Sequence, residues 1–195
     1  MTLTLWLYWA LLLAIGAVRL AELRVSRRRQ RGLAAQGVAR APEPHFRAMV
    51  ILHTGLLLGA GGEATWSGRA PVPAISAAAL LLVAAAIALR LWVIATLGPH
   101  WNVQIMDSAP LGVVTDGPFR WIRHPNYVAV FVELFALPLV HAAWTTAIVG
   151  TAVHVWVLSH RIRAEEAVLL AHAAYRETMA HKPRFVPRIG SRGQA

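Results

Sequence analysis

The chain has 195 residues, which suits a single domain; 57% of them are hydrophobic and only 14% are charged. Soluble domains have about 25% charged and about 45–50% apolar residues, so the excess apolar surface is expected to face lipid. The formal net charge of +10 does not indicate a nucleic-acid partner, because the basic residues lie between apolar segments and not on a platform with interleaved aromatics. The lack of cysteine excludes disulfides, thiolate metal sites and cysteine nucleophiles.

The first apolar segment, residues 2–18, nearly reaches the roughly 20 residues that a membrane span needs. It has no basic region before it and no evident cleavage site after it, so we interpret it as a retained span and not as a signal peptide. Residues 19–47 carry eight arginines against two glutamates, with RVSRRRQR at 24–31. We expect this stretch to be a solvated loop that faces anionic membrane lipids.

Two more apolar segments follow. Residues 48–62 form a short second span or a re-entrant helix. The stretch EATWSGRAPVP at 63–73 is expected to be a loop, because glycine and two prolines punctuate it. Residues 74–97, rich in Ala and Leu, form a third span with Arg90 near its end.

The final apolar block, residues 127–159, is too long for one helix. Pro138 and the sequence HAAW at 141–144 favour a break. We therefore predict a hairpin of two short helices, 127–140 and 144–159, followed by a polar tail.

The distribution of arginine predicts how these five spans are oriented. Residues 19–47 are strongly basic, whereas residues 60–73 carry one arginine and one glutamate. Because Lys and Arg favour cytoplasmic loops, we expect the N-terminus outside, and the polar stretch 98–126 and the C-terminus in the cytoplasm. The predicted fold is all-α: one integral membrane domain over 1–195, with about five transmembrane helices and a cofactor pocket on the cytoplasmic face.

The first polar cluster is DGPFRWIRHPNY at 116–127. Asp-Gly-Pro predicts a turn, and Pro125 suits the first position of a helix. The free N–H groups of that helix, together with Arg120, Arg123 and His124, predict an anion site, for example for a carboxylate. The alternative is that these side chains only anchor a helix end at the lipid headgroups.

The second polar cluster is HRIRAEEAVLL at 160–170. Arg161 and Glu165 are four residues apart and lie on one helical face. They form either an ordinary surface ion pair or part of a site. Glu165 and Glu166 side by side could receive a cation or the hydroxyls of a sugar.

Several ionisable side chains fall inside or at the edge of the predicted spans. Glu133 and His141 are functional candidates, because a buried ionisable group in a membrane is costly. Glu133 is expected to be protonated or to pair with Arg90 or His154. His53 and His154 are expected to have hydrogen-bonded structural roles. We predict no metal site, since HExxH and other metal-ligand spacings are absent.

The motifs together resemble a known family. GPFRWIRHPNYVA at 117–129, a helical hairpin and RIRAEEAVL at 161–169 are similar to the integral-membrane isoprenylcysteine carboxyl methyltransferases, and Tyr175 fits their tail tyrosine. WNVQI at 101–105 resembles the lead-in to the first motif. The resemblance covers about residues 75–188. Residues 74–195 are then the catalytic core, and 1–73 supply the N-terminal spans and the basic loop.

Membrane sterol reductases that use NADPH carry a similar RHPNY, but the RIxxEE element resembles the methyltransferases. The stretch YVAVFVELFALPL at 127–139 also resembles a bacterial subgroup that methylates alkylpyrones, alkylresorcinols or alkylquinones. The resemblance therefore implies O-methylation of a lipidic acceptor in a bacterial-type inner membrane. That acceptor is a prenylcysteine-like carboxylate or a ring hydroxyl.

The resemblance also implies S-adenosylmethionine as methyl donor and assigns roles to particular residues. The residues that it implies for cofactor binding are Gly117, Pro118, Arg123, His124, Pro125, Tyr127, Glu165 and Glu166. The implied catalytic residues are Arg161, Glu165 and His124. The residues expected to bind the acceptor are Arg161, Glu133, Trp101 and Asn102.

The need for a general base depends on the acceptor. A carboxylate needs none, whereas a phenol or an enol benefits from one, and His124 or Glu133 are the candidates. Two other classes of function stay open at this point. One is an NADPH-dependent membrane reductase, and the other is a non-enzymatic membrane protein whose polar clusters are interfacial anchors.

Overall fold

The computed structural model describes residues 2–43 and 45–187. Its helices, in chain order, are α1 (Leu3–Ala35), α2 (Phe46–Trp66), α3 (Pro73–Leu97), η1 (Gly98–His100), η2 (Ala109–Leu111), η3 (Gly117–Arg120), α4 (Pro125–Leu139), α5 (Trp144–Leu169) and α6 (Ala173–Met179). The described residues contain one isolated β-bridge, between Arg40 and Met106, and no strand. The all-α prediction is confirmed.

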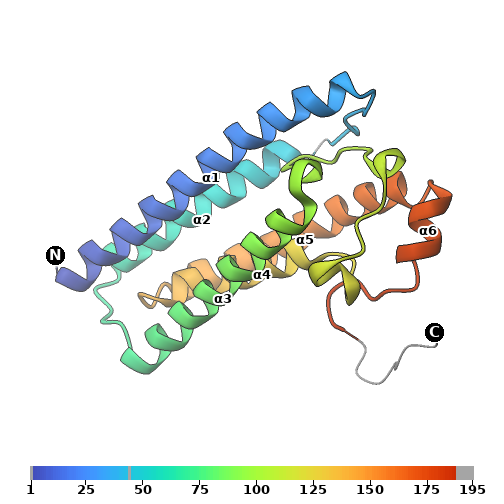
Figure 1. Cartoon of the computed structure of the whole chain (residues 1–195). Helices are drawn as coiled ribbons and strands as arrows, with labels where there is room; N and C mark the ends of the chain where they lie inside the picture. The colour runs from blue at the N-terminus through green and yellow to red at the C-terminus, as the bar shows by residue number, and fades with distance from the viewer. Residues whose placement is uncertain (1, 44, 188–195) are drawn as a thin grey trace.

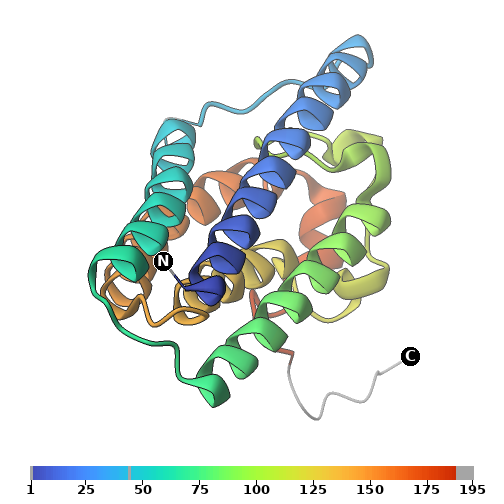
Figure 2. The same ribbon diagram turned by 90° about the vertical axis from the view of Figure 1, so that its left-hand side faces the viewer.

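The five long helices form a bundle whose connections alternate between two ends (Figure 1). The N-terminal end of α1 and the connections 67–72 and 140–143 lie at one end. The connection 36–45, the stretch 98–124 and α6 lie at the other. In Figure 2, α2 and α3 lie on either side of α1, and α4 and α5 lie behind. Helix α4 packs against both α3 and α5, so it is central, and its first residues reach the polar end.

Helix α1 corrects the prediction that residues 19–47 form a solvated loop. It continues without a break to Ala35, and only residues 36–45 form a connection. Arg, Ala, Leu and Gln are good helix formers, and extending an existing helix costs far less than starting one. Ser26 and Leu33, both buried, fix this basic half of α1 against residues 102–106.

The other predicted helices are present with shifted ends. Helix α2 extends to Trp66, into the predicted loop 63–73. Helix α4 ends at Leu139 and α5 begins at Trp144, so the chain breaks where Pro138 and residues 141–144 favoured a break. Helix α5 runs to Leu169, ten residues past the predicted end. The RIRAEE element therefore lies on the same rigid helix as the apolar segment before it.

The outer surface of the bundle is apolar. Leu13, Leu81 and Ile148 are each more than 60% exposed. Among the described helices, α1 and the stretch Pro73–His100 have the length and hydropathy of a membrane span, and Pro125–Leu139 is a shorter apolar helix. Lipid is the environment in which such exposed side chains cost least.

The inside of the bundle holds a network of four charged side chains. Arg19 pairs with Glu133 and with Glu22, and Arg90 binds Glu22 through two hydrogen bonds of 2.7 and 2.6 Å. The predicted partners of Glu133, Arg90 and His154, are therefore wrong. Arg19 reaches Glu133 because the long arginine side chain extends from α1 across the bundle to α4.

Candidate functional site

The C-terminal segment lies beside the start of α4, where an anion site was predicted. His124 is the residue before the helix and Pro125 is the first helical residue. The N–H groups of Arg123 and His124 donate to the carbonyl oxygens of Pro183 and Arg184, at 2.9 and 3.0 Å. The C-terminal segment thus closes over this helix end. The N–H groups of Arg123 and His124 are therefore not available to a ligand, and the anion site at the helix itself stays a prediction.

Glu166 connects the RHPNY motif to this C-terminal segment. It accepts from His124 Nε2 at 3.1 Å and from two nitrogens of Arg184, and it pairs with Arg123 at 3.1 Å. Burial by itself would raise the pKa of Glu166, but the hydrogen bonds from Arg184 and His124 outweigh it and hold the pKa below its ordinary value. Glu166 therefore positions the motif as a carboxylate.

Arg161 is the centre of a second, buried network and does not form a surface ion pair. Its Nε donates to the hydroxyl of Tyr127 at 2.9 Å, its Nη1 pairs with Glu43, and its Nη2 donates to the carbonyl of Val103. Tyr127 in turn donates to Glu165. Arg161 and Glu165 are therefore linked through the phenol, and no hydrogen bond joins them directly.

Glu43 is the residue of this network that the sequence reasoning missed. It lies in the connection between α1 and α2, accepts from the N–H of Ile105 at 3.2 Å, and its side chain is only 3% exposed. Burial raises the pKa of the Glu43 carboxyl, and the nearby Arg161 opposes this. The signal was weak, because a single acidic residue in a basic stretch is compatible with a solvated loop.

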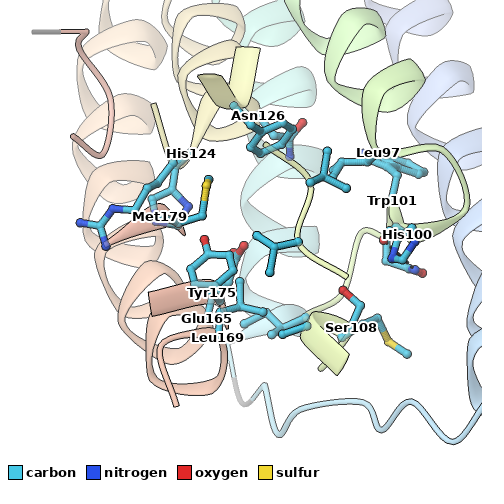
Figure 3. Close-up of a pocket in the computed structure, with 18 of the residues that line it drawn as sticks. Leu97, His100, Trp101, Ser108, His124, Asn126, Glu165, Leu169, Tyr175 and Met179 are labelled. Carbon is cyan, nitrogen blue, oxygen red and sulfur yellow. Dashed lines mark hydrogen bonds between the residues drawn. The ribbon is translucent and has the colours of Figure 1, made fainter. Parts of the chain in front are cut away.

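A first cavity, of about 150 Å³, lies among the polar segments at the end of the bundle. Figure 3 shows its wall, with His124, Glu165, Tyr175 and Met179 on one side and Leu97, His100 and Trp101 on the other. Three buried nitrogens of lining residues have no hydrogen-bond partner among the described residues: Arg123 Nε, His100 Nδ1 and Trp101 Nε1. The arginine and indole nitrogens can only donate. Unpaired donors of this kind fit a ligand that carries acceptor oxygens or nitrogens.

A second cavity, of about 500 Å³, lies along the apolar helices. Helices α1, α2, α4 and α5 supply most of its wall, mainly with leucine and other apolar side chains. Arg19, Glu22 and Arg90 line it as well. His53 and His154 face each other edge-to-face at 5.9 Å in its wall. His53 Nδ1 donates to the Met49 carbonyl at 2.7 Å, but neither nitrogen of His154 has a described partner, so the hydrogen-bonded role predicted for His154 is wrong.

The two cavities share part of their walls. The shared residues are Trp101, Asn102, Asn126, Tyr127 and Arg161. A ligand in the polar cavity and a ligand in the apolar cavity would therefore meet at the Tyr127–Arg161 network. This arrangement suits the transfer of a group between a polar and an apolar molecule.

The structure places the predicted site residues in three groups. The predicted acceptor-binding residues Trp101, Asn102 and Arg161 lie in the shared wall, and so does Tyr127. The predicted cofactor-binding residues Arg123, His124, Pro125 and Glu165 line the first cavity. The remaining predicted residues, Gly117, Pro118, Glu166 and Glu133, line neither cavity.

Those four remaining residues have structural positions. Gly117 has a φ of 54°, and a Cβ there would lie 3.0 Å from Cγ2 of Thr96 in α3, so it permits a tight turn against that helix. Pro118 is buried in the same turn. Glu166 holds the RHPNY motif and Glu133 holds Arg19. Direct contact of these four with cofactor or acceptor is not supported by their positions.

Comparison with known proteins identifies a related family over part of the chain. The sequence model of the isoprenylcysteine carboxyl methyltransferase (ICMT) family matches residues 78–171. The uncharacterized protein YpbQ of Bacillus subtilis is 28% identical over 163 residues, which cover 84% of this chain and 96% of that protein. An uncharacterized protein of Haemophilus influenzae is 29% identical over 156 residues, 80% of this chain and 90% of that protein.

The family match spans the polar stretch after α3, the RHPNY motif and the RIRAEE element, which supply most of the wall of the first cavity. Much of the wall of the second cavity comes from α1 and α2, which lie outside the matched residues. Together with the two apolar helices of spanning length, the family match indicates an integral membrane protein with a methyltransferase core. Over residues 78–171, a little under half of the chain, the sequence matches the ICMT family.

Proposed function

We propose that the protein is an S-adenosylmethionine-dependent O-methyltransferase that methylates a lipidic acceptor at the cytoplasmic face of the membrane. The observation that carries this proposal is the pair of cavities, the first lined by polar and apolar side chains and the second mainly apolar, that share the wall around Tyr127 and Arg161. A water-soluble donor and a membrane-soluble acceptor need two such compartments with a common boundary.

The residues of the first cavity fit the donor. When bound, S-adenosylmethionine supplies an electrophilic methyl group on a sulfonium sulfur. Arg123 Nε and Trp101 Nε1 are unpaired donors suited to its carboxylate. Glu165 supplies negative charge close to the shared wall, where it would stabilise the positive charge of a sulfonium.

The second cavity fits an apolar chain with an oxygen-bearing head. Three of the N–H groups of Arg161 are used by Tyr127, Glu43 and Val103. An arginine has five, so two remain for an acceptor oxygen. The acceptor is either a prenylcysteine-like carboxylate or a hydroxyl of an alkylresorcinol, alkylpyrone or alkylquinone.

Catalysis of methyl transfer depends mainly on how the protein positions the two reactants and on its electrostatic stabilisation of the transition state. Glu43 and Val103 fix the guanidinium of Arg161. Glu166 fixes His124 and Arg123 at the entrance to α4. Both shared-wall side chains, Tyr127 and Arg161, are more than 90% buried, so the transfer point is shielded from bulk water.

The first test is calorimetric binding of S-adenosylmethionine and of NADPH to the detergent-purified protein, side by side. Binding of the methyl donor alone supports the proposal. It then justifies a methyl-transfer assay with prenylcysteine analogues, alkylresorcinols and alkylpyrones. Binding of NADPH alone would replace the proposal with a reductase, and binding of neither to folded protein would favour interfacial anchoring.

A matched pair of variants tests the site. Arg161→Ala should lower the turnover number by about 10²- to 10³-fold, as the loss of a preorganised donor does. Arg163→Ala removes an exposed arginine of the same helix that binds only Ser159. It should keep the wild-type rate. Equal rates for the two variants would remove Arg161 from the site.

A further inference from the structure

The shared wall contains a chain of hydrogen bonds that is suited to moving a proton. Arg161 Nε donates to the Tyr127 oxygen at 2.9 Å, and the Tyr127 hydroxyl donates to Glu165 Oε2. A phenolic oxygen can accept two hydrogen bonds and donate one. Arg161 occupies one acceptor position, so a second one is left for a ligand.

Tyr127 is the link between the two cavities in this chain. It lines both of them, whereas Glu165 lines only the first. A molecule in the apolar cavity can therefore reach the tyrosine, and the tyrosine reaches the carboxylate. Glu165 is also accessible from the polar cavity, from which a proton can leave to water.

The other carboxylates near this wall are already committed to cations. Glu43 pairs with Arg161 and lines neither cavity. Glu22 lines the second cavity but binds Arg19 and Arg90. Glu165 differs, because it accepts its hydrogen bond from the phenol of Tyr127.

The two general bases that the sequence suggested, His124 and Glu133, are not positioned to deprotonate a hydroxyl in the apolar cavity. His124 binds Glu166 through Nε2 and lines only the first cavity. Glu133 binds Arg19 and lines neither cavity. If the acceptor enters as a hydroxyl, another group must take its proton.

We infer that Tyr127 and Glu165 form a proton relay that deprotonates a hydroxyl acceptor in the apolar cavity during methyl transfer. The inference rests on the proposed function and specifies it further. The acceptor hydroxyl donates to Tyr127, and as its O–H bond breaks the Tyr127 proton moves to Glu165. The acceptor oxygen forms a bond to the methyl carbon and the carbon–sulfur bond breaks, so the sulfonium leaves as a neutral thioether. One proton remains on Glu165 and passes to water through the polar cavity.

Arg161 has a defined part in this step. Its guanidinium lies against the tyrosine oxygen, where negative charge is transiently shared during the transfer, and Glu43 keeps it there. The relay serves an acceptor that arrives protonated, such as a phenol or an enol. A carboxylate acceptor is already ionised at neutral pH and gains nothing from it.

The test compares Glu165→Gln and Tyr127→Phe with two matched controls, Glu177→Gln and Tyr8→Phe. Glu177 is exposed on α6, and Tyr8 is buried but binds the Leu137 carbonyl and lines neither cavity. The relay variants should lose about 10²-fold or more in turnover with a weakly acidic alkylphenol at neutral pH. They should recover as the pH rises and the phenol ionises in solution. An alkylated nitrophenol, assayed at a pH above its own pKa where it is already ionised, should be methylated by the relay variants at about the wild-type rate.

A second readout requires no methyl donor. The ionised nitrophenol absorbs at longer wavelength, so a titration of the bound alkylnitrophenol reports how readily the site accepts its proton. An ionised Glu165 that is coupled to the bound phenol through Tyr127 disfavours the phenolate, so Glu165→Gln should ionise the bound phenol at a lower pH than wild type and both controls. Unchanged titration curves together with unchanged pH–rate profiles would overturn the relay.

Two further outcomes separate this inference from the function on which it rests. If Glu165→Gln weakens donor affinity in calorimetry but leaves the pH–rate profile and the phenol titration unchanged, Glu165 binds the donor and the relay is wrong. If the wild-type protein methylates no acceptor, the proposed function fails. The phenol titration still decides whether the Tyr127–Glu165 pair accepts a proton.

Discussion

Arg161 and Arg19, which lie inside the bundle, are each held by a carboxylate from a distant part of the chain. Arg161 pairs with Glu43, 118 residues away, and Arg19 pairs with Glu133, 114 residues away. Removing one partner of a buried pair leaves an uncompensated charge, which costs more than the pair itself contributes. These pairs therefore specify how the helices associate as well as where the guanidinium groups lie.

Glu166 makes the RHPNY end of the bundle sensitive to acid. Its pKa in the folded protein is below the ordinary value of about 4.3, because hydrogen bonds from Arg184 and His124 outweigh the effect of burial. The stabilisation is fully present above the pKa of the unfolded chain and is lost as the pH falls through the lower, folded-state pKa.

We predict that Glu166→Gln lowers stability at neutral pH by about 1–2 kcal/mol, since hydrogen bonds to a charged group are replaced by weaker ones. Wild type should lose stability below a pH of about 4, as Glu166 becomes protonated. The variant should lose less stability over the same pH range. Thermal unfolding in detergent between pH 3 and 7 measures both effects. Glu177→Gln should follow wild type. A Glu166→Gln curve parallel to wild type over the whole range would contradict the assignment.

Helices α1 and α2 approach each other where Gly61 leaves room for Trp9. A Cβ added at Gly61 would lie 2.6 Å from Cζ2 and 2.7 Å from Cζ3 of the Trp9 ring. Trp9 also donates to Thr65 at 3.2 Å, and it lines the second cavity. This contact sets both the spacing of the two helices and the width of one part of the apolar cavity.

We predict that Gly61→Ala destabilises the protein by about 1–3 kcal/mol, because the added methyl group overpacks the contact. Gly55→Ala on the same helix meets nothing within 4 Å. It should be neutral or stabilise by up to about 1 kcal/mol, since alanine is the better helix former. Melting temperatures of both variants in one detergent test this, and a Gly55→Ala loss equal to that of Gly61→Ala would contradict it.

The molecule as a whole has one polar end and one apolar end. The connections 36–45 and 98–124 and α6 are together at the end that holds the first cavity, and the connections 67–72 and 140–143 are opposite (Figure 1). Arg24, Arg27, Arg28 and Arg31 recur at helical spacing on the exposed face of α1 near the polar end. Arginine near span ends favours the cytoplasmic side, so both motifs are predicted to face the cytoplasm.

We predict that a reporter fused after residue 195 is cytoplasmic and that one inserted at residue 70 is on the other side. Replacing Arg24, Arg27, Arg28 and Arg31 by glutamine should produce a mixed orientation, because the charge bias between the loops falls. Paired reporters, one active only inside and one only outside, measure this. A C-terminal fusion located outside in the unmodified protein would reverse the topology.

Local patterns in the sequence were sufficient for the helical class and for the elements of the site. Hydropathy predicted the apolar helices, Pro138 and residues 141–144 predicted the break between α4 and α5, and the RHPNY and RIRAEE segments indicated the family. These features depend on residues close together in the chain, whose spacing translates directly into helical faces and turns.

Only the tertiary structure decided which groups meet. Glu43 lies outside the matched residues 78–171 and yet holds Arg161. The C-terminal segment accepts from the N–H groups of Arg123 and His124, and Glu133 pairs with Arg19 of the first helix. A buried charge or N–H must find a partner, but the sequence does not say which one. The choice depends on the packing of elements more than a hundred residues apart.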